Sequence, residues 1–147
     1  SRMLFKRLNR SDAERVFCVF QANVANIAAD DVVQLECTAA SVDGVKIVQP
    51  TSAQLNAVVG IADAAIANGA YGLVQIYGYR STSRVLQSGS TLPIGVALVA
   101  AAGQDWLDTI SLTGAGAYLP GFVLLETAQS AIGANSTTRI VTVTGTM

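Results

Sequence analysis

Histidine is absent from the 147 residues, cysteine occurs twice, and charged side chains make up only 13% of the chain. Without histidine, the Ser-His-Asp and Cys-His arrangements and the commonest general base are excluded. Cys18 and Cys37 lack Cys-x-x-Cys spacing, whereas zinc sites usually take their ligands from tight local pairs. We therefore expect no metal and no cofactor, and we interpret both cysteines as small buried residues on strands.

Charge of both signs is scarce, and long hydrophobic runs are missing as well. Soluble domains usually contain about 25% charged residues, whereas this chain has a mean hydropathy of +0.45 and 23 alanines. Either Ser, Thr, Asn and Gln side chains cover the surface, or much of it is hidden against other chains. No stretch approaches the roughly 18 to 20 apolar residues of a membrane helix. The basic start also lacks the apolar region of a signal peptide, so we expect no membrane contact.

The beginning of the chain carries most of the positive charge. Residues 1–15 contain five basic and two acidic groups, a net charge of +3, whereas the remaining residues have a net charge of −4. We divide the chain into a basic N-terminal arm, residues 1–14, and a β-rich domain, residues 15–147. The arm either docks on an acidic protein surface or is simply solvated. It is too short to indicate direct nucleic-acid binding.

The chain is organised around the stretch from Val58 to Arg80, VVGIADAAIANGAYGLVQIYGYR. Two apolar runs of β type flank a turn in which glycine and asparagine permit positive φ. Glycines inside the runs indicate bulges or places where two backbones approach closely. The glycines that this scaffold requires are Gly60, Gly69, Gly72 and Gly78.

Shorter strand-like segments precede and follow this stretch. Residues 15–24 are apolar on both faces, which is typical of a strand that is central or covered by an interface. Residues 32–37 alternate like a half-buried strand, and Asp43-Gly44 predicts a tight turn to an antiparallel partner at 45–49. We predict an all-β fold, a single compact β-barrel or β-sandwich with short helical turns and an extended N-terminal arm. Short helical turns are expected at 51–56 and 103–110.

Carboxylates and tyrosines are the remaining candidates for a site. Glycosidases use two carboxylates that flank the sugar, but solvated turns explain the acids of this chain more simply, so we expect no enzyme. The tyrosines either form a surface patch that stacks on sugars or on a partner, or pack along the sheet. The acids are Asp30, Asp31, Asp105, Asp108 and Glu126, and the tyrosines are Tyr71, Tyr77 and Tyr79.

Three segments carry a family resemblance: SDAERVFCV at Ser11–Val19, DGVKIVQP at Asp43–Pro50 and GIADAAIANGAYGLVQIYGYR at Gly60–Arg80. The later segment SGSTLPIGVALV and the valine-rich C-terminus are similar too. Together they resemble the small head-decoration, or cement, proteins of tailed bacteriophages. The resemblance spans most of the chain and rests on Gly, Ala and Val patterns rather than on catalytic signatures.

This resemblance implies a compact β-domain that binds the outside of an icosahedral phage head, often as a homotrimer, and bridges subunits of the major capsid protein. Such a protein is made in the cytoplasm of the bacterial host and ends on the outer capsid surface of the virion. The alternative is a virion-surface carbohydrate- or receptor-binding module on the same scaffold. The arm residues that would contact the capsid are Arg2, Leu4, Phe5, Lys6, Arg7, Leu8 and Arg10.

Overall fold

The computed structural model describes residues 15–37, 44–51, 55–85, 92–109, 121–124 and 140–142. Within these ranges the chain forms strands and one 3-10 turn, and no α-helix. The prediction of an all-β fold is therefore confirmed. The elements are β1 (Arg15–Ala22), β2 (Val32–Leu35), β3 (Lys46–Val48), η1 (Leu55–Ala57), β4 (Val58–Ala62), β5 (Tyr71–Arg80), β6 (Ala97–Ala100), β7 (Leu107–Thr109), β8 (Phe122–Leu124) and β9 (Ile140–Thr142).

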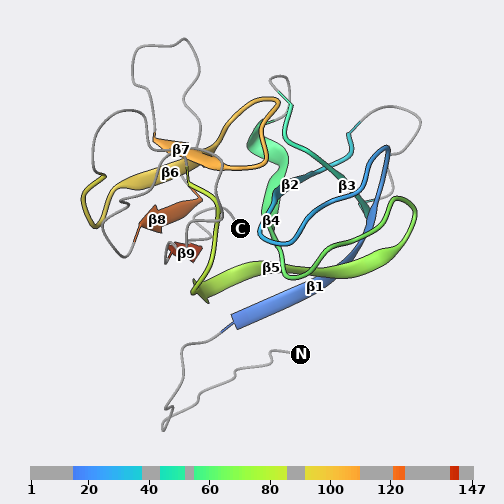
Figure 1. Cartoon of the computed structure of the whole chain (residues 1–147), viewed down its shortest axis with the longest axis horizontal. Coiled ribbons are helices and arrows are strands. Elements are labelled where there is room, and N and C mark those ends of the chain that lie inside the picture. Colours follow the sequence, from blue (N-terminus) through green and yellow to red (C-terminus); the bar gives the residue numbers. More distant parts are fainter. Residues whose placement is uncertain are drawn as a thin grey trace, which may run out of the picture.

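Five strands close into a barrel in the order β1-β3-β2-β4-β5, and the pairing of β5 with β1 completes the ring (Figure 1). A closed ring must reverse strand direction an even number of times, so a ring of five strands needs at least one parallel pair. Here β1 and β3 supply that pair, and the other four pairings are antiparallel. Of the two predicted architectures, the barrel is the one that forms.

A second group of strands extends the sheet beyond the barrel. The C-terminal end of β5 pairs with β9, and the order continues through β8 and β6 to β7. In Figure 1 these four strands lie to the left of the barrel. β5 has ten residues, long enough for its first part to pair with β1 and β4 and its last three residues to pair with β9. The long apolar run after Ala70 thus joins the two halves.

The barrel has its own core, to which every barrel strand contributes one fully buried side chain. Ala22, Val33, Ile47, Ala62 and Val74 come from β1, β2, β3, β4 and β5 in turn, and each is at most 1% exposed. Ile27 and Ile66, which form an isolated antiparallel bridge, close one end of this core. Filling the interior with side chains is typical of barrels of this size.

A second core lies outside the barrel, between β2 and β4 on one side and the extending strands on the other. Val32 and Ile61 point into it from the barrel, next to Leu98, Leu107 and Phe122. Because Val32 and Val33 enter different cores, β2 is buried on both faces. The prediction of a half-buried strand at 32–37 is therefore wrong.

Three other local predictions can be compared with the structure. The helical turn expected before Val58 is confirmed by η1. The helical turn expected at 103–110 is wrong, because β7 pairs with β6 there. The cysteines were expected to be buried, but Cys18 is only half-buried, and Cys37 is exposed because β2 ends at Leu35.

The scaffold glycines are required for two reasons. A Cβ atom at Gly60 would lie 2.0 Å from the Gln75 carbonyl oxygen, and one at Gly72 would lie 2.5 Å from the Ile66 side chain. Gly69 and Gly78 have backbone φ angles of 81° and 97°, which residues other than glycine rarely adopt. The predicted close approach inside the first run is confirmed at Gly60.

Candidate functional site

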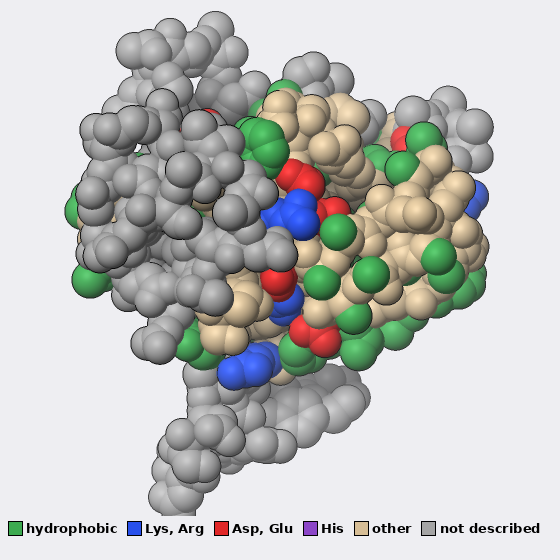
Figure 2. Space-filling view, in the orientation of Figure 1, with side chains coloured by type: hydrophobic (Ala, Val, Ile, Leu, Met, Phe, Trp, Pro, Cys, Tyr) green, Lys and Arg blue, Asp and Glu red, His purple; other side chains and the backbone are tan. Residues whose placement is uncertain are grey.

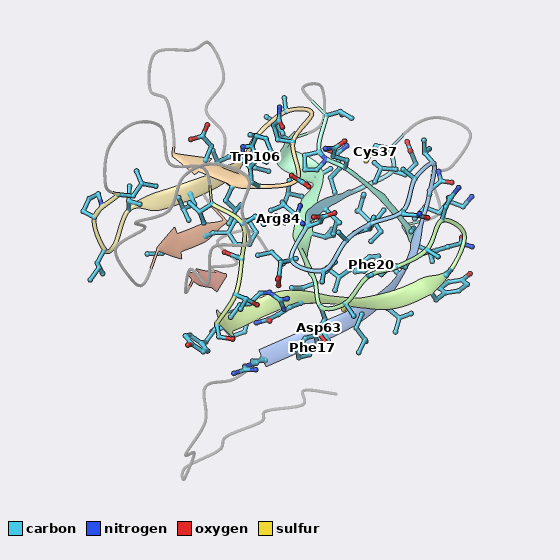
Figure 3. The ribbon with its side chains drawn as sticks, in the orientation of Figure 1. Phe17, Phe20, Cys37, Asp63, Arg84 and Trp106 are labelled. Carbon is cyan, nitrogen blue, oxygen red and sulfur yellow. The ribbon has the colours of Figure 1, made fainter. Side chains whose placement is uncertain are left out.

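The outward side of β1 and β5 exposes a strip of large apolar side chains. We call it the outer apolar face; its residues are Phe17, Val19, Tyr71 and Leu73, each 38 to 64% exposed. The two strands pair directly, with Val19 opposite Leu73 and Gln21 opposite Tyr71, so the strip extends across both. The register shifts between Val16 and Phe17, and Val16 and its partner Tyr77 therefore face the other side of the strands. Hydrophobic side chains follow the lower edge of the molecule in Figure 2, and Phe17 is labelled on β1 in Figure 3.

The outer apolar face contains almost no charge. Neither β1 nor β5 has an acidic residue, and Arg80, at the end of β5, is buried. Arg15 lies at one end of the strip, with its guanidinium 5.5 Å from the centre of the Tyr79 ring. Contiguous exposed apolar surface of this kind commonly marks a contact with another molecule.

The three tyrosines predicted as a surface patch all lie on β5. Tyr71 and Tyr77 are 64% and 40% exposed, whereas Tyr79 is half-buried beside Arg15. Tyr77 follows Tyr71 by six positions along the strand, a distance of about 20 Å at 3.3 Å per residue. The structure therefore places Tyr71 on the outer apolar face and Tyr77 beyond the register shift between β1 and β5.

Charged side chains, of which Asp31 and Arg80 are buried, gather where the barrel meets the extending strands. We call this set the ion-pair cluster; it consists of Asp30, Asp31, Asp63, Arg80, Arg84 and Asp105. Acidic and basic side chains lie next to one another down the middle of the molecule in Figure 2. Figure 3 labels Arg84 there, between the two groups of strands.

Arg80 binds two turns of the barrel at once. Its Nη1 donates to Asp63 Oδ1 at 3.1 Å, and its Nη2 donates to Asp30 and to the Ala62 carbonyl oxygen, the latter at 3.2 Å. Asp30, which has a φ of 69°, also accepts a 3.0 Å hydrogen bond from the Thr82 hydroxyl. The Arg80 side chain is only 8% exposed; these contacts pair both of its Nη atoms, whereas its buried Nε has no hydrogen-bond partner.

Arg84 bridges the barrel to the extension by contacting Asp31 on one side and Asp105 on the other, with its Nη1 atom 3.0 Å from Asp31 Oδ1. Asp31 Oδ2 accepts a 2.7 Å hydrogen bond from the Ala28 amide. Burial raises the pKa of Asp31 to about 6; the Ala28 amide and Arg84 oppose this rise, whereas Asp105 adds to it. Asp31 is thus held in a buried environment that favours its neutral form more than water does.

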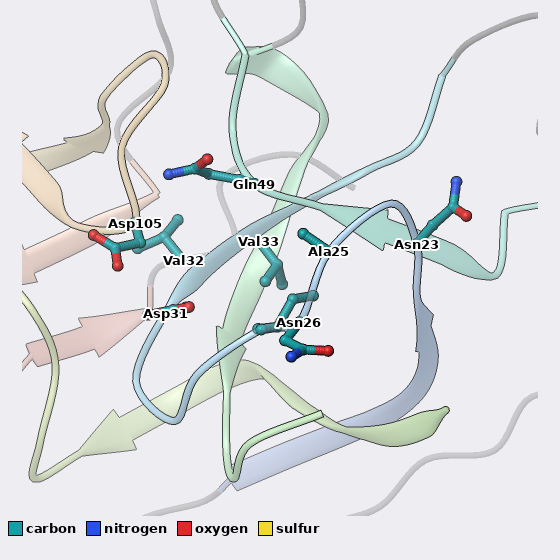
Figure 4. Close-up of a pocket in the computed structure, with 9 residues that line it drawn as sticks. Asn23, Ala25, Asn26, Asp31, Val32, Val33, Gln49 and Asp105 are labelled. Carbon is teal, nitrogen blue, oxygen red and sulfur yellow. The ribbon is translucent and has the colours of Figure 1, made fainter. Parts of the chain in front are cut away.

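A small pocket opens beside this cluster (Figure 4). Its volume is about 160 Å³. Asp31 and Asp105 lie at one end of it and Asn23 at the other. Both carboxylates contact Arg84, so the acidic end of the pocket belongs to the ion-pair cluster. The lining residues are Asn23, Ala25, Asn26, Ile27, Asp31, Val32, Val33, Gln49 and Asp105.

The structure brings together only some of the acidic residues that were weighed as catalytic candidates. Asp30, Asp31 and Asp105 all join ion pairs with Arg80 or Arg84. Asp108 lies on β7 opposite Val99, and Glu126 is outside the described residues, as are all the arm residues expected to contact a capsid.

Sequence reasoning missed the two arginines of the ion-pair cluster. The available signal was their position, because Arg80 ends a long apolar strand and Arg84 follows four residues later in a chain with few charges. Buried charges in such surroundings need partners. That argument would have predicted pairing, although not the identity of the acids.

Within the described ranges, no group of His, Cys, Asp or Glu side chains is placed to hold a metal ion. Nor does any helix there have the length and apolarity to cross a membrane. No protein-family model matches the sequence, and no curated protein is significantly similar to it.

Proposed function

We propose that this chain is a capsid decoration protein, which binds the outer surface of a tailed-phage head and stabilises the shell by bridging capsid subunits. The observation that carries the proposal is the outer apolar face on an otherwise closed barrel. A barrel that exposes a continuous apolar strip suits a protein that works within an assembly, where interfaces are larger and more apolar than transient ones. Stabilising a shell in this way requires buried interface area and no catalysed reaction.

The low charge of the chain and its family resemblance support the same role. With only 13% charged residues, the chain has few charges whose desolvation would oppose the burial of its surface against a shell. The segment from Gly60 to Arg80, which carries the resemblance most strongly, forms β4 and β5 and so builds the scaffold. Repetition around a symmetric shell lets modest contacts add up through multivalency.

The basic arm is the part that we assign to the shell. Its positive charge and its apolar residues Leu4, Phe5 and Leu8 suit a groove between capsid subunits with acidic walls. The partner is the major capsid protein, and we expect no cofactor, no nucleic-acid contact and a position on the outside of the virion.

The direct test uses heads of the phage that encodes the chain, prepared without this protein. Purified protein should bind these heads to saturation and raise the temperature at which they release DNA, measured with an intercalating dye. Heads that bind no protein at any concentration would refute the proposal. Binding without any thermal protection would remove the cementing role.

The arm is tested separately. Deletion of residues 1–10, or replacement of Arg2, Lys6, Arg7 and Arg10 by Gln, should weaken head binding at least tenfold, whereas the unfolding midpoint should not change. Lys46→Gln, which removes one positive charge from β3, is the matched control and should bind normally. Unchanged binding after deletion would show that the arm does not dock.

A carbohydrate- or receptor-binding module remains the second candidate, because Tyr71 and Tyr77 are exposed. Glycan-array binding that is lost in Tyr77→Ala and kept in Ile94→Ala would favour it, since Ile94 is also exposed but lies outside the outer apolar face. Absence of glycan binding by the intact protein would remove this candidate.

A further inference from the structure

The turn between β6 and β7, residues 101–106, lies against the barrel and carries one of the two carboxylates that meet on Arg84. We propose that this turn opens and closes against the barrel in response to pH. It stays closed while Asp31 and Asp105 share one proton beside Arg84, and it opens more often once that proton is lost. The proposal concerns movement within a single chain and does not depend on what the protein binds.

Three hydrogen bonds fasten the turn to the barrel. The Val32 amide of β2 donates to the Asp105 carbonyl oxygen at 3.1 Å, and the Gly103 amide donates to the Pro50 carbonyl oxygen at 2.8 Å. Gln49 Nε2 donates to the Gly103 carbonyl oxygen at 3.2 Å. Neither hydrophobic core includes a residue of the turn. The turn can therefore separate from the barrel by local opening, without unfolding either core.

Arg84 supplies the charge contact of the closed turn. Its Nη1 atom donates a hydrogen bond to Asp105 and lies 3.0 Å from Asp31 Oδ1. One guanidinium thus faces two carboxylates, and the buried Asp31 Oδ1 accepts no hydrogen bond within the described residues. Two carboxylates that share one site repel each other when both are ionised. A proton between them removes the repulsion and provides a hydrogen-bond donor.

The pKa of Asp31 agrees with this geometry. Burial raises it to about 6, and Asp105 adds to the rise through its charge and through a hydrogen bond between the two side chains; the Ala28 amide and Arg84 act in the opposite direction. The closed turn therefore binds the proton more tightly than the open turn. Protonation favours closure fully below about pH 4, and this contribution is lost as the pH rises through about 6.

The other charged groups around Asp31 form a separate pair of contacts. Asp30, its neighbour in the sequence, and Asp63, after β4, both contact Arg80. The response to pH is therefore assigned to the contacts that Asp31 makes with the segment after β5 and with the turn. The charged groups of the elements that pack around Asp31 are Asp30, Asp63, Arg80, Arg84 and Asp105.

The pocket beside the ion-pair cluster gives the turn room to move. Asp31 and Val32 line it from the barrel, and Asp105 lines it from the turn (Figure 4). Its volume of about 160 Å³ is enough for water to reach both carboxylates. Ionised carboxylates gain more from this hydration than a protonated pair does, so loss of the proton favours separation of the turn from the barrel.

Amide hydrogen exchange in the intact chain tests the proposal. Protection factors of the Val32 and Gly103 amides should fall about tenfold between pH 5 and pH 7.5, as linkage gives for a pKa of about 6 in the closed turn and 3.8 in the open turn. The Ala22 amide, which donates to the Ala70 carbonyl oxygen in the barrel, is the internal control. It should be better protected at both pH values. Equal protection of all three amides would mean that the chain opens as one unit, and would overturn the proposal.

Two variants identify the group that responds. Asp31→Asn removes the shared proton and should make the protection of the turn independent of pH. Asp63→Asn, on the other arginine, is the matched control and should keep the tenfold change. If Asp31→Asn does not fold, carboxyl carbon-13 shifts of the intact chain decide, because Asp31 and Asp105 should both respond to one proton lost near pH 6. A tenfold change that persists in Asp31→Asn, its loss in Asp63→Asn, or midpoints near pH 4 for both carboxyls would each overturn the proposal.

Discussion

Two walls of one barrel differ in what lies outside them. β2 and β4 are apolar on both sides, and their outward residues Val32 and Ile61 are completely buried under the extending strands. β1 and β5 are also apolar on both sides, yet their outward residues Val19 and Leu73 are 59% and 47% exposed. The sequence patterns of the two walls are alike, so the difference comes from where the rest of the chain packs.

Paired charges and exposed apolar side chains thus lie on different sides of the barrel. The ion-pair cluster joins the covered wall to the extension, and its charges are paired inside the chain. The outer apolar face has no such cover within the described residues. Substitutions in the first region should therefore change the free energy of unfolding, whereas substitutions in the second should change it little and should weaken the proposed contact with the capsid.

The largest expected effect is at Arg80. Arg80→Met removes the cation that pairs with Asp30 and Asp63 and leaves carboxylates without their charge partner. We expect unfolding to become easier by about 3 to 5 kcal/mol, as when one member of a buried pair is removed. Urea denaturation measures this. Arg15→Met on the exposed wall is the control and should stay within about 0.5 kcal/mol; equal losses in the two variants would contradict the comparison.

Truncating one aliphatic side chain on each wall tests the comparison directly. Ile61→Ala empties part of a fully buried site and should cost about 2 to 4 kcal/mol. Leu73→Ala removes a side chain that is already 47% exposed and should cost less than about 1 kcal/mol in the single chain. Unfolding at low protein concentration, where copies are separate, provides the measurement. Comparable costs would mean that the outer apolar face is covered within the chain.

Asp31 makes the free energy of unfolding depend on pH. Because burial raises its pKa from 3.8 to about 6, the folded state binds this proton more tightly than the unfolded state. The contribution of Asp31 to stability therefore increases as pH falls through about 6 towards 4, and is lost as pH rises above 6.

We expect this contribution to be on the order of 1 to 2 kcal/mol. Asp31→Asn, which still offers an oxygen to the Ala28 amide, should flatten the difference between urea unfolding at pH 4.5 and at pH 7.5. Asp63→Asn, at the exposed end of the cluster, is the control. An unchanged pH profile in Asp31→Asn would show that other groups cause it.

The sequence predicted the structure correctly where a residue type is required for a single structural reason. Gly60 was predicted to mark a bulge, a bend or a close backbone approach, and its hydrogen atoms do face the Gln75 carbonyl. The run at 15–24, apolar on both faces, was predicted to be central or covered by an interface, and β1 does pair on both sides. These patterns depend on immediate neighbours in the sheet.

The sequence was misleading where distant packing decided the outcome. Alternation at 32–37 suggested one buried face, but the second core buries Val32 on the other face, and the residues of that core that cover the barrel come after position 84. Asp30 and Arg80 are 50 positions apart, so no local spacing predicts their pairing. The same limitation applies to the outer apolar face, because a strand pattern does not say which layer covers it.

The smallest expected effect in stability is at Val24, and there the two kinds of effect oppose each other. Val24→Asn tolerates the φ of 73° better and should stabilise the single chain by about 0.5 to 1 kcal/mol. The same change removes an apolar side chain that is 76% exposed just beyond β1, and it should weaken head binding about two- to fivefold, as expected for a modest loss of buried apolar area. Thermal unfolding of the free chain and titration onto heads prepared without the protein measure the two quantities. If Asn stabilises the chain and leaves head binding unchanged, the strain at Val24 belongs to the loop alone.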